Sequence, residues 1–158
     1  MCRSKGMLGR DEASNWPHSH SSGASVRRRA LFEGHDGAEA VAVSRVLDTL
    51  DVDTMWCPGP GDGHGPRCPL VEQGHCDLLD KADFVINNLG EAHSFRAAVA
   101  PAVDDAVHGD RHVLVLTGWQ RAESLRAALP GSKVVEGPLT TQIVQDVAQL
   151  TAGVADVV

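Results

Sequence analysis

The sequence predicts an α/β protein with one doubly wound, five-stranded parallel sheet in the order 2-1-3-4-5 and helices on both faces. From residue 29 onward, five short apolar runs alternate with segments of helical period, and parallel strands need such a crossover between neighbours. The run HVLVLTG at residues 112–118 is continuously apolar, as expected of a strand covered on both faces. The predicted order is common for chains with this alternation.

The first third of this region predicts two strands separated by an amphipathic helix. The strands are ALFEG at residues 30–34 and DTMWC at residues 53–57. Asp36 is a typical N-cap, with Glu39 three residues later as in a capping box. The helix that follows carries apolar residues at i, i+3, i+4 and i+7, which form one face: Val43, Val46, Leu47 and Leu50.

The middle of the chain predicts a long loop, a third strand and a helix. The loop from residue 58 is rich in Gly and Pro and holds one short helix within residues 69–81. The third strand is DFVIN at residues 83–87, and a helix follows over residues 91–108, which Pro101 kinks or interrupts. The residues of this helix expected to face the core are Phe95, Val99, Ala102, Val103 and Val107.

The last third predicts a strand between two helices. After the strand at residues 112–118, QRAESLRAAL at residues 120–129 forms a short helix that Pro130 and Gly131 end. KVVEG at residues 133–137 is the fifth strand, and Thr140 is the expected N-cap of the final helix. Its apolar face consists of Ile143, Val144, Val147 and Leu150.

Charge divides the chain into two parts. Residues 1–28 are rich in Ser, Gly, His and charge, lack periodicity and are expected to be a disordered basic tail, ahead of a single domain at residues 29–158. Six basic and two acidic residues precede residue 30, against eight basic and nineteen acidic residues after it. Nucleic acid is therefore an unlikely partner for the acidic domain. No apolar run spans a membrane, and a cytoplasmic location is expected.

In this fold, ligands bind beyond the carboxyl ends of the strands, so the residues that follow the strands are the candidates for function. The chain places polar or small residues at each of these ends. They are Glu33, His35, Asp36, Asn88, Thr117 and Gly137.

Two stretches, VLVLTG and GPLTTQIVQDVAQL, resemble the receiver domains of bacterial response regulators, with a layout that matches over residues 30–153. The resemblance implies a flavodoxin-like fold. It places Thr117 at the receiver's conserved hydroxyl residue and Pro138 at the proline of the last turn. The aspartate that accepts the phosphoryl group falls on Asn88, and the conserved lysine falls on Gly137.

The acidic pair that holds magnesium in receivers falls near Gly34 and His35, flanked by Glu33 and Asp36. Phosphoryl transfer needs a carboxylate nucleophile, and Mg²⁺ prefers carboxylate ligands. The resemblance therefore implies a pseudo-receiver without phosphorylation chemistry. Because the 158 residues offer no output domain, such a module would act by docking on another protein or on itself, through the surface that maps to residues 120–150.

The loop at residues 57–80 is enlarged and rich in metal-ligand side chains. Thiolate and imidazole ligands suit zinc, iron or an iron–sulfur cluster. The spacings, Cys-x₁₀-Cys and Cys-x₇-Cys, differ from those of standard zinc fingers, whose ligands come in close pairs. The candidate ligands are Cys57, Cys68, Cys76, His64 and His75.

Two other interpretations of this loop stay open. The thiols could be ordinary buried side chains, or Cys68 and Cys76 could form a redox-sensitive disulfide. A rival function is a small metal- or thiol-dependent enzyme with its site near Asn88, Thr117 and His35. Enzymatic activity is the less favoured interpretation, because the strand ends offer few titratable groups for an acid–base pair.

Overall fold

The computed structural model describes residues 27–34, 36–59, 68–90, 94–107, 111–116 and 119–152. One parallel sheet of five strands has the order β2-β1-β3-β4-β5. The strands are β1 (Arg28–Glu33), β2 (Val52–Cys57), β3 (Phe84–Gly90), β4 (His112–Leu116) and β5 (Lys133–Glu136). The helices are α1 (Gly37–Asp48), α2 (Pro69–Gln73), α3 (Ser94–Ala106), α4 (Trp119–Ala128) and α5 (Thr141–Ala152).

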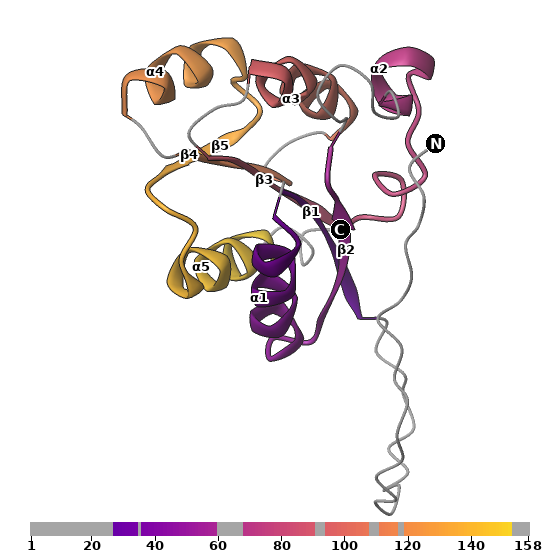
Figure 1. Ribbon diagram of the computed structural model, residues 1–158, viewed down its shortest axis with the longest axis vertical. Coiled ribbons are helices and arrows are strands. Elements are labelled where there is room, and N and C mark those ends of the chain that lie inside the picture. The colour runs from indigo at the N-terminus through magenta and orange to yellow at the C-terminus, as the bar shows by residue number, and fades with distance from the viewer. Residues whose placement is uncertain are drawn as a thin grey trace, which may run out of the picture.

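The helices form two layers on opposite faces of the sheet. Figure 1 shows α1 and α5 on one face and α2, α3 and α4 on the other. The predicted α/β class with a parallel sheet and covering helices is confirmed. Residues 1–26 of the predicted tail lie outside the described residues, and Arg28 already belongs to β1.

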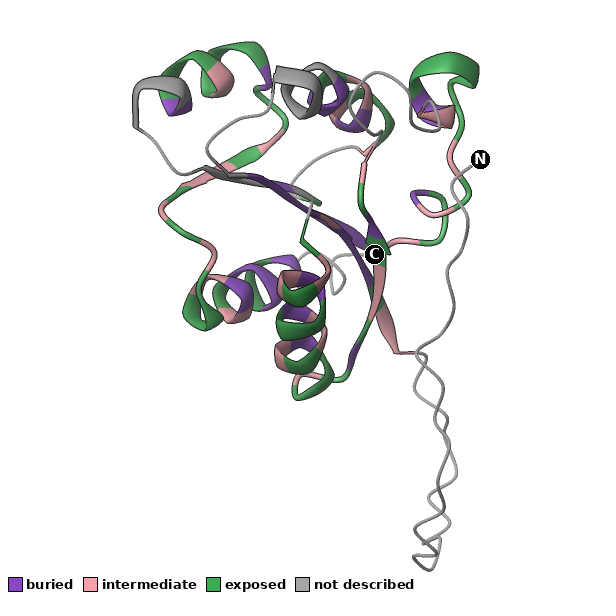
Figure 2. Ribbon diagram, viewed as in Figure 1, coloured by how far each residue is buried: buried purple, intermediate pink, exposed green. Residues whose placement is uncertain are grey.

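Each face of the sheet has its own hydrophobic cluster, because successive side chains of a strand point to opposite faces. Phe32 and Ile86 pack with Leu47 on the α1 and α5 face, and Leu31 and Val85 pack on the α2 and α3 face. These strand residues are buried, as the purple segments of Figure 2 show. Burial on both faces makes the sheet the rigid support for everything at its carboxyl edge.

Arginine side chains fasten the amino-terminal edge of the sheet. Arg28 Nη2 donates a hydrogen bond of 3.0 Å to the Ala148 carbonyl near the end of α5, and its guanidinium lies 5.6 Å from the centre of the Phe84 ring. Arg27 pairs with three carboxylates at 2.9, 3.1 and 2.9 Å: Asp48, Asp51 and Asp53. The basic run that the sequence places before the first strand therefore anchors α1 and α5.

Both helix caps expected from the sequence are present. The Ala38 N–H donates to Asp36 Oδ1 over 2.8 Å at the start of α1, and the Ile143 N–H donates to Thr140 Oγ1 over 3.2 Å at the start of α5. Each oxygen satisfies one of the N–H groups that a helix start leaves unpaired.

The bounds of the third strand and of the helix that follows it differ from the predicted ones. The third strand does not stop at residue 87 but continues to Gly90, because its last residues pair with β4. The short helix predicted within residues 69–81 is present as α2, and it ends at Gln73, where Gly74 adopts a left-handed φ of 69° that closes the helix. The helix predicted over residues 91–108 covers Ser94–Ala106 and runs through Pro101.

The apolar face of α3 agrees with the expected one where side chains are described. Val99 and Val103 are buried, and Ala102 and Val107 are half-buried against the same cluster. In the described parts of the chain, no helix combines the length and the apolar character that crossing a bilayer would need.

Replacing Leu47 by alanine should lower the free energy of unfolding by about 2–5 kcal/mol, because it leaves a cavity under α1. Val41 on the same helix is 36% exposed, so Val41→Ala should change this free energy by less than about 0.5 kcal/mol. Urea denaturation of both variants measures the difference. Equal losses would contradict the described burial of α1.

Candidate functional site

Three polar side chains form a row across the carboxyl ends of neighbouring strands. Glu33, the last residue of β1, is the register partner of Cys57 on β2 and of Asn87 on β3. Two residues earlier, Leu31 and Val85 pack into the cluster beneath α2 and α3. Because side chains alternate along a strand, the whole row belongs to this same face. We call Cys57, Glu33 and Asn87 the polar row.

A hydrogen bond fixes two members of the polar row. Asn87 Nδ2 donates to Glu33 Oε2 over 2.8 Å, and Asn87 is only 1% exposed. The carboxylate can only accept, so the amide nitrogen must face it and Oδ1 must point elsewhere. Asn87 Oδ1 is buried and accepts no hydrogen bond from any described residue. Such an acceptor costs about 1–3 kcal/mol when left unpaired.

Asn88, where the resemblance places the receiver's phosphoacceptor, lies within β3 and not in the loop after it. Its register partner is Val115 on β4, and an irregularity in the pairing follows between Asn88 and Gly90. The side chain is 9% exposed. A buried, neutral amide replaces the solvent-facing carboxylate that phosphoryl transfer would need.

The space beside Gly34, where the resemblance places a magnesium ligand, is filled by an aromatic ring. A Cβ atom at Gly34 would lie 2.5 Å from both Cε1 and Cζ of Phe32. Phe32 is fully buried and cannot move aside without disturbing the core. On the outer side, Trp56 Nε1 donates to the Gly34 carbonyl over 2.8 Å. Gly34 is therefore enclosed by two aromatic side chains.

Gly137, at the position of the receiver's lysine, has a φ of 128°. Residues with a side chain rarely adopt this conformation. A lysine here would be strained whatever space surrounds it. The backbone after β5 thus fits the glycine that the sequence has and disfavours the residue that receivers use.

Three predicted site residues, His35, Thr117 and His64, lie outside the described residues. Asp36 is exposed and its carboxylate caps α1. Of the predicted residues at the strand ends, Glu33 is hydrogen-bonded to Asn87, a residue that was not among the predicted site residues.

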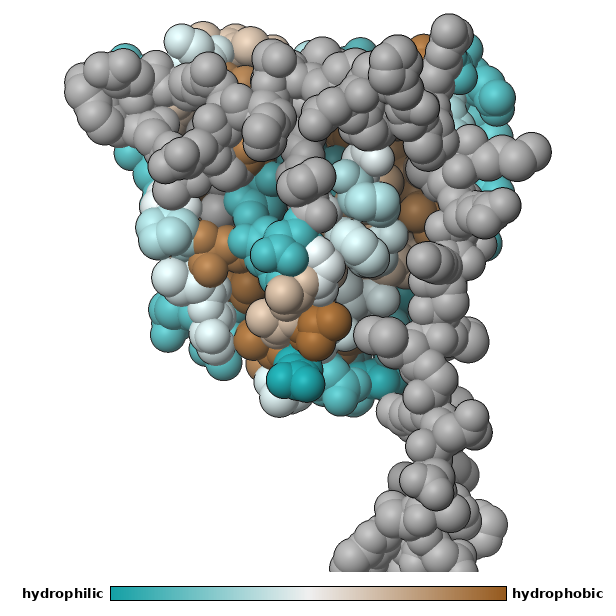
Figure 3. Space-filling model, in the orientation of Figure 1, coloured by the Kyte–Doolittle hydropathy of each residue, from teal (hydrophilic) through white to brown (hydrophobic). Residues whose placement is uncertain are grey.

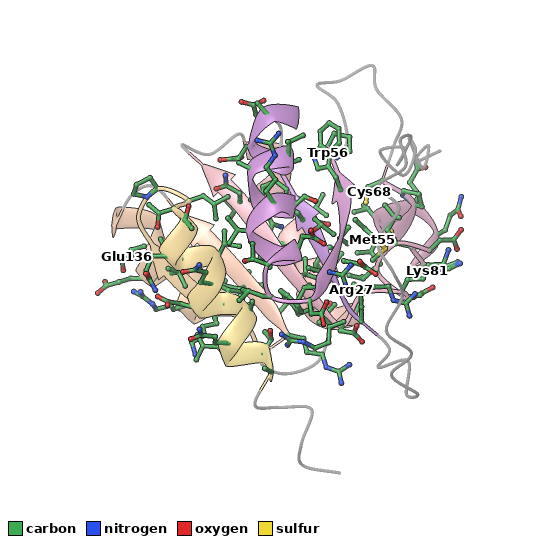
Figure 4. The ribbon with its side chains drawn as sticks, turned by 90° about the horizontal axis from the view of Figure 1, so that it is seen from below. Arg27, Met55, Trp56, Cys68, Lys81 and Glu136 are labelled. Carbon is green, nitrogen blue, oxygen red and sulfur yellow. The ribbon has the colours of Figure 1, made fainter. Side chains whose placement is uncertain are left out.

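The described cysteines are free thiols on the α2 side of the sheet. Cys57 is buried, and Cys68 and Cys76 are partly buried against the same hydrophobic cluster. Burial raises the pKa of the Cys68 thiol, and the nearby Glu33 carboxylate and Cys76 thiol raise it further. Backbone groups at residues 70 and 71 act in the opposite direction. Figure 4 shows Cys68 on the side of β2 opposite Trp56.

His75 is separated from the thiols and faces carboxylates. Its Nε2 lies 3.1 Å from Asp77 Oδ1, and its Nδ1 lies 3.0 Å from Asp80 Oδ2. Among the described residues, these three are the one group of three or more His, Cys, Asp or Glu side chains whose ligand atoms lie within 4.8 Å of one another. All three are exposed. The predicted set of cysteines and His75 is thus divided between the inside and the outside of the loop.

Solved structures with the same fold include a response regulator receiver protein from Pseudoalteromonas atlantica. It has a TM-score of 0.56 and 15% identity, and the match covers 81% of this chain and 99% of that one. A candidate pilus assembly protein from Burkholderia thailandensis has a TM-score of 0.57 and 15% identity over 80% of this chain and 98% of that one. A pilus assembly-related protein from Burkholderia pseudomallei has a TM-score of 0.57 and 16% identity over 80% and 90%.

Neither a protein-family model nor a curated protein matches the sequence. Identities of 15–16% establish likeness of fold alone. The chain therefore has a receiver-like α/β fold, and its function has to be argued from its own residues.

Proposed function

We propose that this chain is a receiver-like regulatory module that works without phosphorylation and acts by docking on a protein. The observation that carries the proposal is the enclosure of Gly34 by the buried Phe32 ring, with a Cβ contact of 2.5 Å. A metal-binding carboxylate at that position would have to displace the core. The amide of Asn88 and the backbone conformation of Gly137 remove the other two requirements of the reaction.

A regulatory module that is not phosphorylated must transmit its signal by binding another protein through its surface. The docking face proposed here spans residues 120–150, which include most of α4 and α5 and all of the edge strand β5. An ion pair of 2.7 Å between Arg126 and Glu136 joins α4 to β5. Leu150 is 46% exposed on α5. The ion pair and the exposed Leu150 give the proposed face both charged and apolar groups, and this combination supports docking on a partner or on a second copy.

Apolar residues also reach the visible face over α1 and α5 in Figure 3. The half-buried side chains that pack on this core cluster are Val46, Leu50, Val135, Leu139 and Ile143. Three of them, Val135, Leu139 and Ile143, belong to the proposed docking face itself. A contact with a partner there would be transmitted directly to the sheet.

The loop at residues 57–80 is the proposed regulatory element of the module. Its thiols pack on the same cluster as α3, so metal binding or thiol oxidation there would move α2 against the sheet. The proposal includes a cytoplasmic location, a reducing compartment in which thiols such as Cys68 and Cys76 stay reduced.

The rival enzymatic function gains no support from a specific contact. Glu33, the titratable group at the end of β1, is hydrogen-bonded to the Asn87 amide. An amide cannot serve as the partner in an acid–base pair. We therefore favour docking over catalysis.

Incubation with acetyl phosphate and Mg²⁺ should leave the mass of the protein unchanged. The Asn88→Asp variant should behave in the same way, because the carboxylate alone restores neither the metal ligand nor the lysine. Intact-mass spectrometry measures the outcome. The positive control is a receiver that retains the phosphoacceptor aspartate, the metal ligands and the lysine. Addition of one phosphoryl group to the unmodified chain would overturn the proposal.

Self-association, one form of the proposed docking, should depend on Leu150. Leu150→Asp should weaken it on the order of ten-fold, because a charge replaces an apolar contact. Val71→Asp is the matched control, since Val71 is 57% exposed on α2, away from the docking face. Sedimentation velocity over a concentration series compares the two. Equal weakening by both variants, or by neither, would contradict the assignment of the face.

A further inference from the structure

The polar row and the thiol above it form a cluster of electron-pair donors. Glu33 and Asn87 lie side by side on β1 and β3. Cys68, which is the N-cap of α2, packs on the same face of the sheet. Cys68 is near enough to Glu33 and Cys76 for their charges to act on its thiol. The Glu33 carboxylate, the Asn87 amide and the Cys68 thiol therefore all belong to the face of the sheet that α2 and α3 cover.

Asn87 supplies the observation that points to a ligand. Its Nδ2 is committed to Glu33, and its Oδ1 is buried without a hydrogen bond from any described residue. Buried acceptors are nearly always paired. The side chain is 1% exposed, and its rotamer is fixed by the bond to Glu33. An acceptor held in this way beside a carboxylate and a thiol has the chemistry of a cation ligand.

We propose that Glu33, Asn87 and Cys68 bind one divalent transition-metal ion of the zinc class. A sulfur ligand selects a borderline or soft ion over Mg²⁺ or Ca²⁺, and carboxylate oxygen is an accepted zinc ligand. On binding, the Cys68 thiol releases its proton to solvent as the metal–sulfur bond forms. Asn87 Oδ1 gains the partner that it lacks.

This ligand set differs from both sites that the sequence suggests. Asn88 is the residue at the phosphoacceptor position, whereas Asn87 points to the opposite face of β3. His75 belongs to an exposed group with Asp77 and Asp80 and not to the thiols. The proposed ion would join β1, β3 and the start of α2, and so connect the loop to the strand ends.

The inference rests on the proposed regulation of the loop by metal, but docking through residues 120–150 does not depend on it. A failed metal titration would leave the sedimentation experiment unaffected. A failed sedimentation experiment would likewise leave the metal site standing. The two proposals can therefore fail separately.

Titration of the full, reduced, metal-free chain with Zn²⁺, and with Co²⁺ as a spectroscopic probe, tests the site. We expect about one ion per chain and a thiolate-to-cobalt absorption band that Cys68→Ser abolishes. Glu33→Gln and Asn87→Leu should each weaken Zn²⁺ binding about ten-fold or more. Asn87→Asp, which keeps the oxygen ligand, should retain binding and should show a larger Zn²⁺-dependent rise in melting temperature.

His75→Ala is the matched control, and it should leave both the affinity and the cobalt band unchanged. Far-UV circular dichroism of each variant confirms that it is folded. Three results would overturn the proposal. The first is that the chain does not bind Zn²⁺. The second is that Glu33→Gln and Asn87→Leu both bind Zn²⁺ with the affinity of the unmodified chain. The third is that His75→Ala loses Zn²⁺ binding while Glu33→Gln binds normally.

Discussion

The alternation of side chains along β1 determines what the carboxyl edge of the sheet can do. Phe32 points to the α1 and α5 face, where it is fully buried, and its ring occupies the space beside Gly34. Glu33, one residue later, points to the opposite face and binds Asn87. A shift by one residue would exchange these faces and bring the carboxylate into the core. The apolar packing of the sheet therefore holds the acidic group away from the position that receiver chemistry would use.

From this constraint the other features of the edge follow. Under the proposed function, the closed Gly34 position means that a carboxylate at Asn88 or a lysine at Gly137 alone would not restore phosphoryl transfer. The edge instead carries a fixed carboxylate–amide pair beneath the thiols of the loop. This pair joins β1 to β3 on the face where the thiols of the loop pack.

The sequence predicts the fold class and the helix caps well because those signals are local. Asp36 and Thr140 precede amphipathic helices and act as the caps they resemble. The true end of β3 was missed because asparagine has a low strand propensity, and pairing with β4 overrides it. The short helix predicted within residues 69–81 is present as α2, and Gly74 marks its end.

The candidate site was harder to predict than the fold. Two adjacent asparagines point to opposite faces, and only the register with β1 shows that Asn87 is the one beside Glu33. Composition alone grouped His75 with the cysteines, although the chain turns His75 outward toward Asp77 and Asp80 while Cys76 packs inward. Residue types can be counted from a sequence, but the side of a loop on which each one lies depends on tertiary packing.

A double-mutant cycle between Glu33→Ala and Asn87→Ala tests the central claim most directly. The claim is that these two side chains form a partly buried, charge-assisted pair at the edge of the sheet. Urea denaturation of the two single variants and the double variant gives their coupling free energy. The described bond of 2.8 Å predicts about 1.5–3 kcal/mol of favourable coupling. Additive effects, with no coupling, would contradict it.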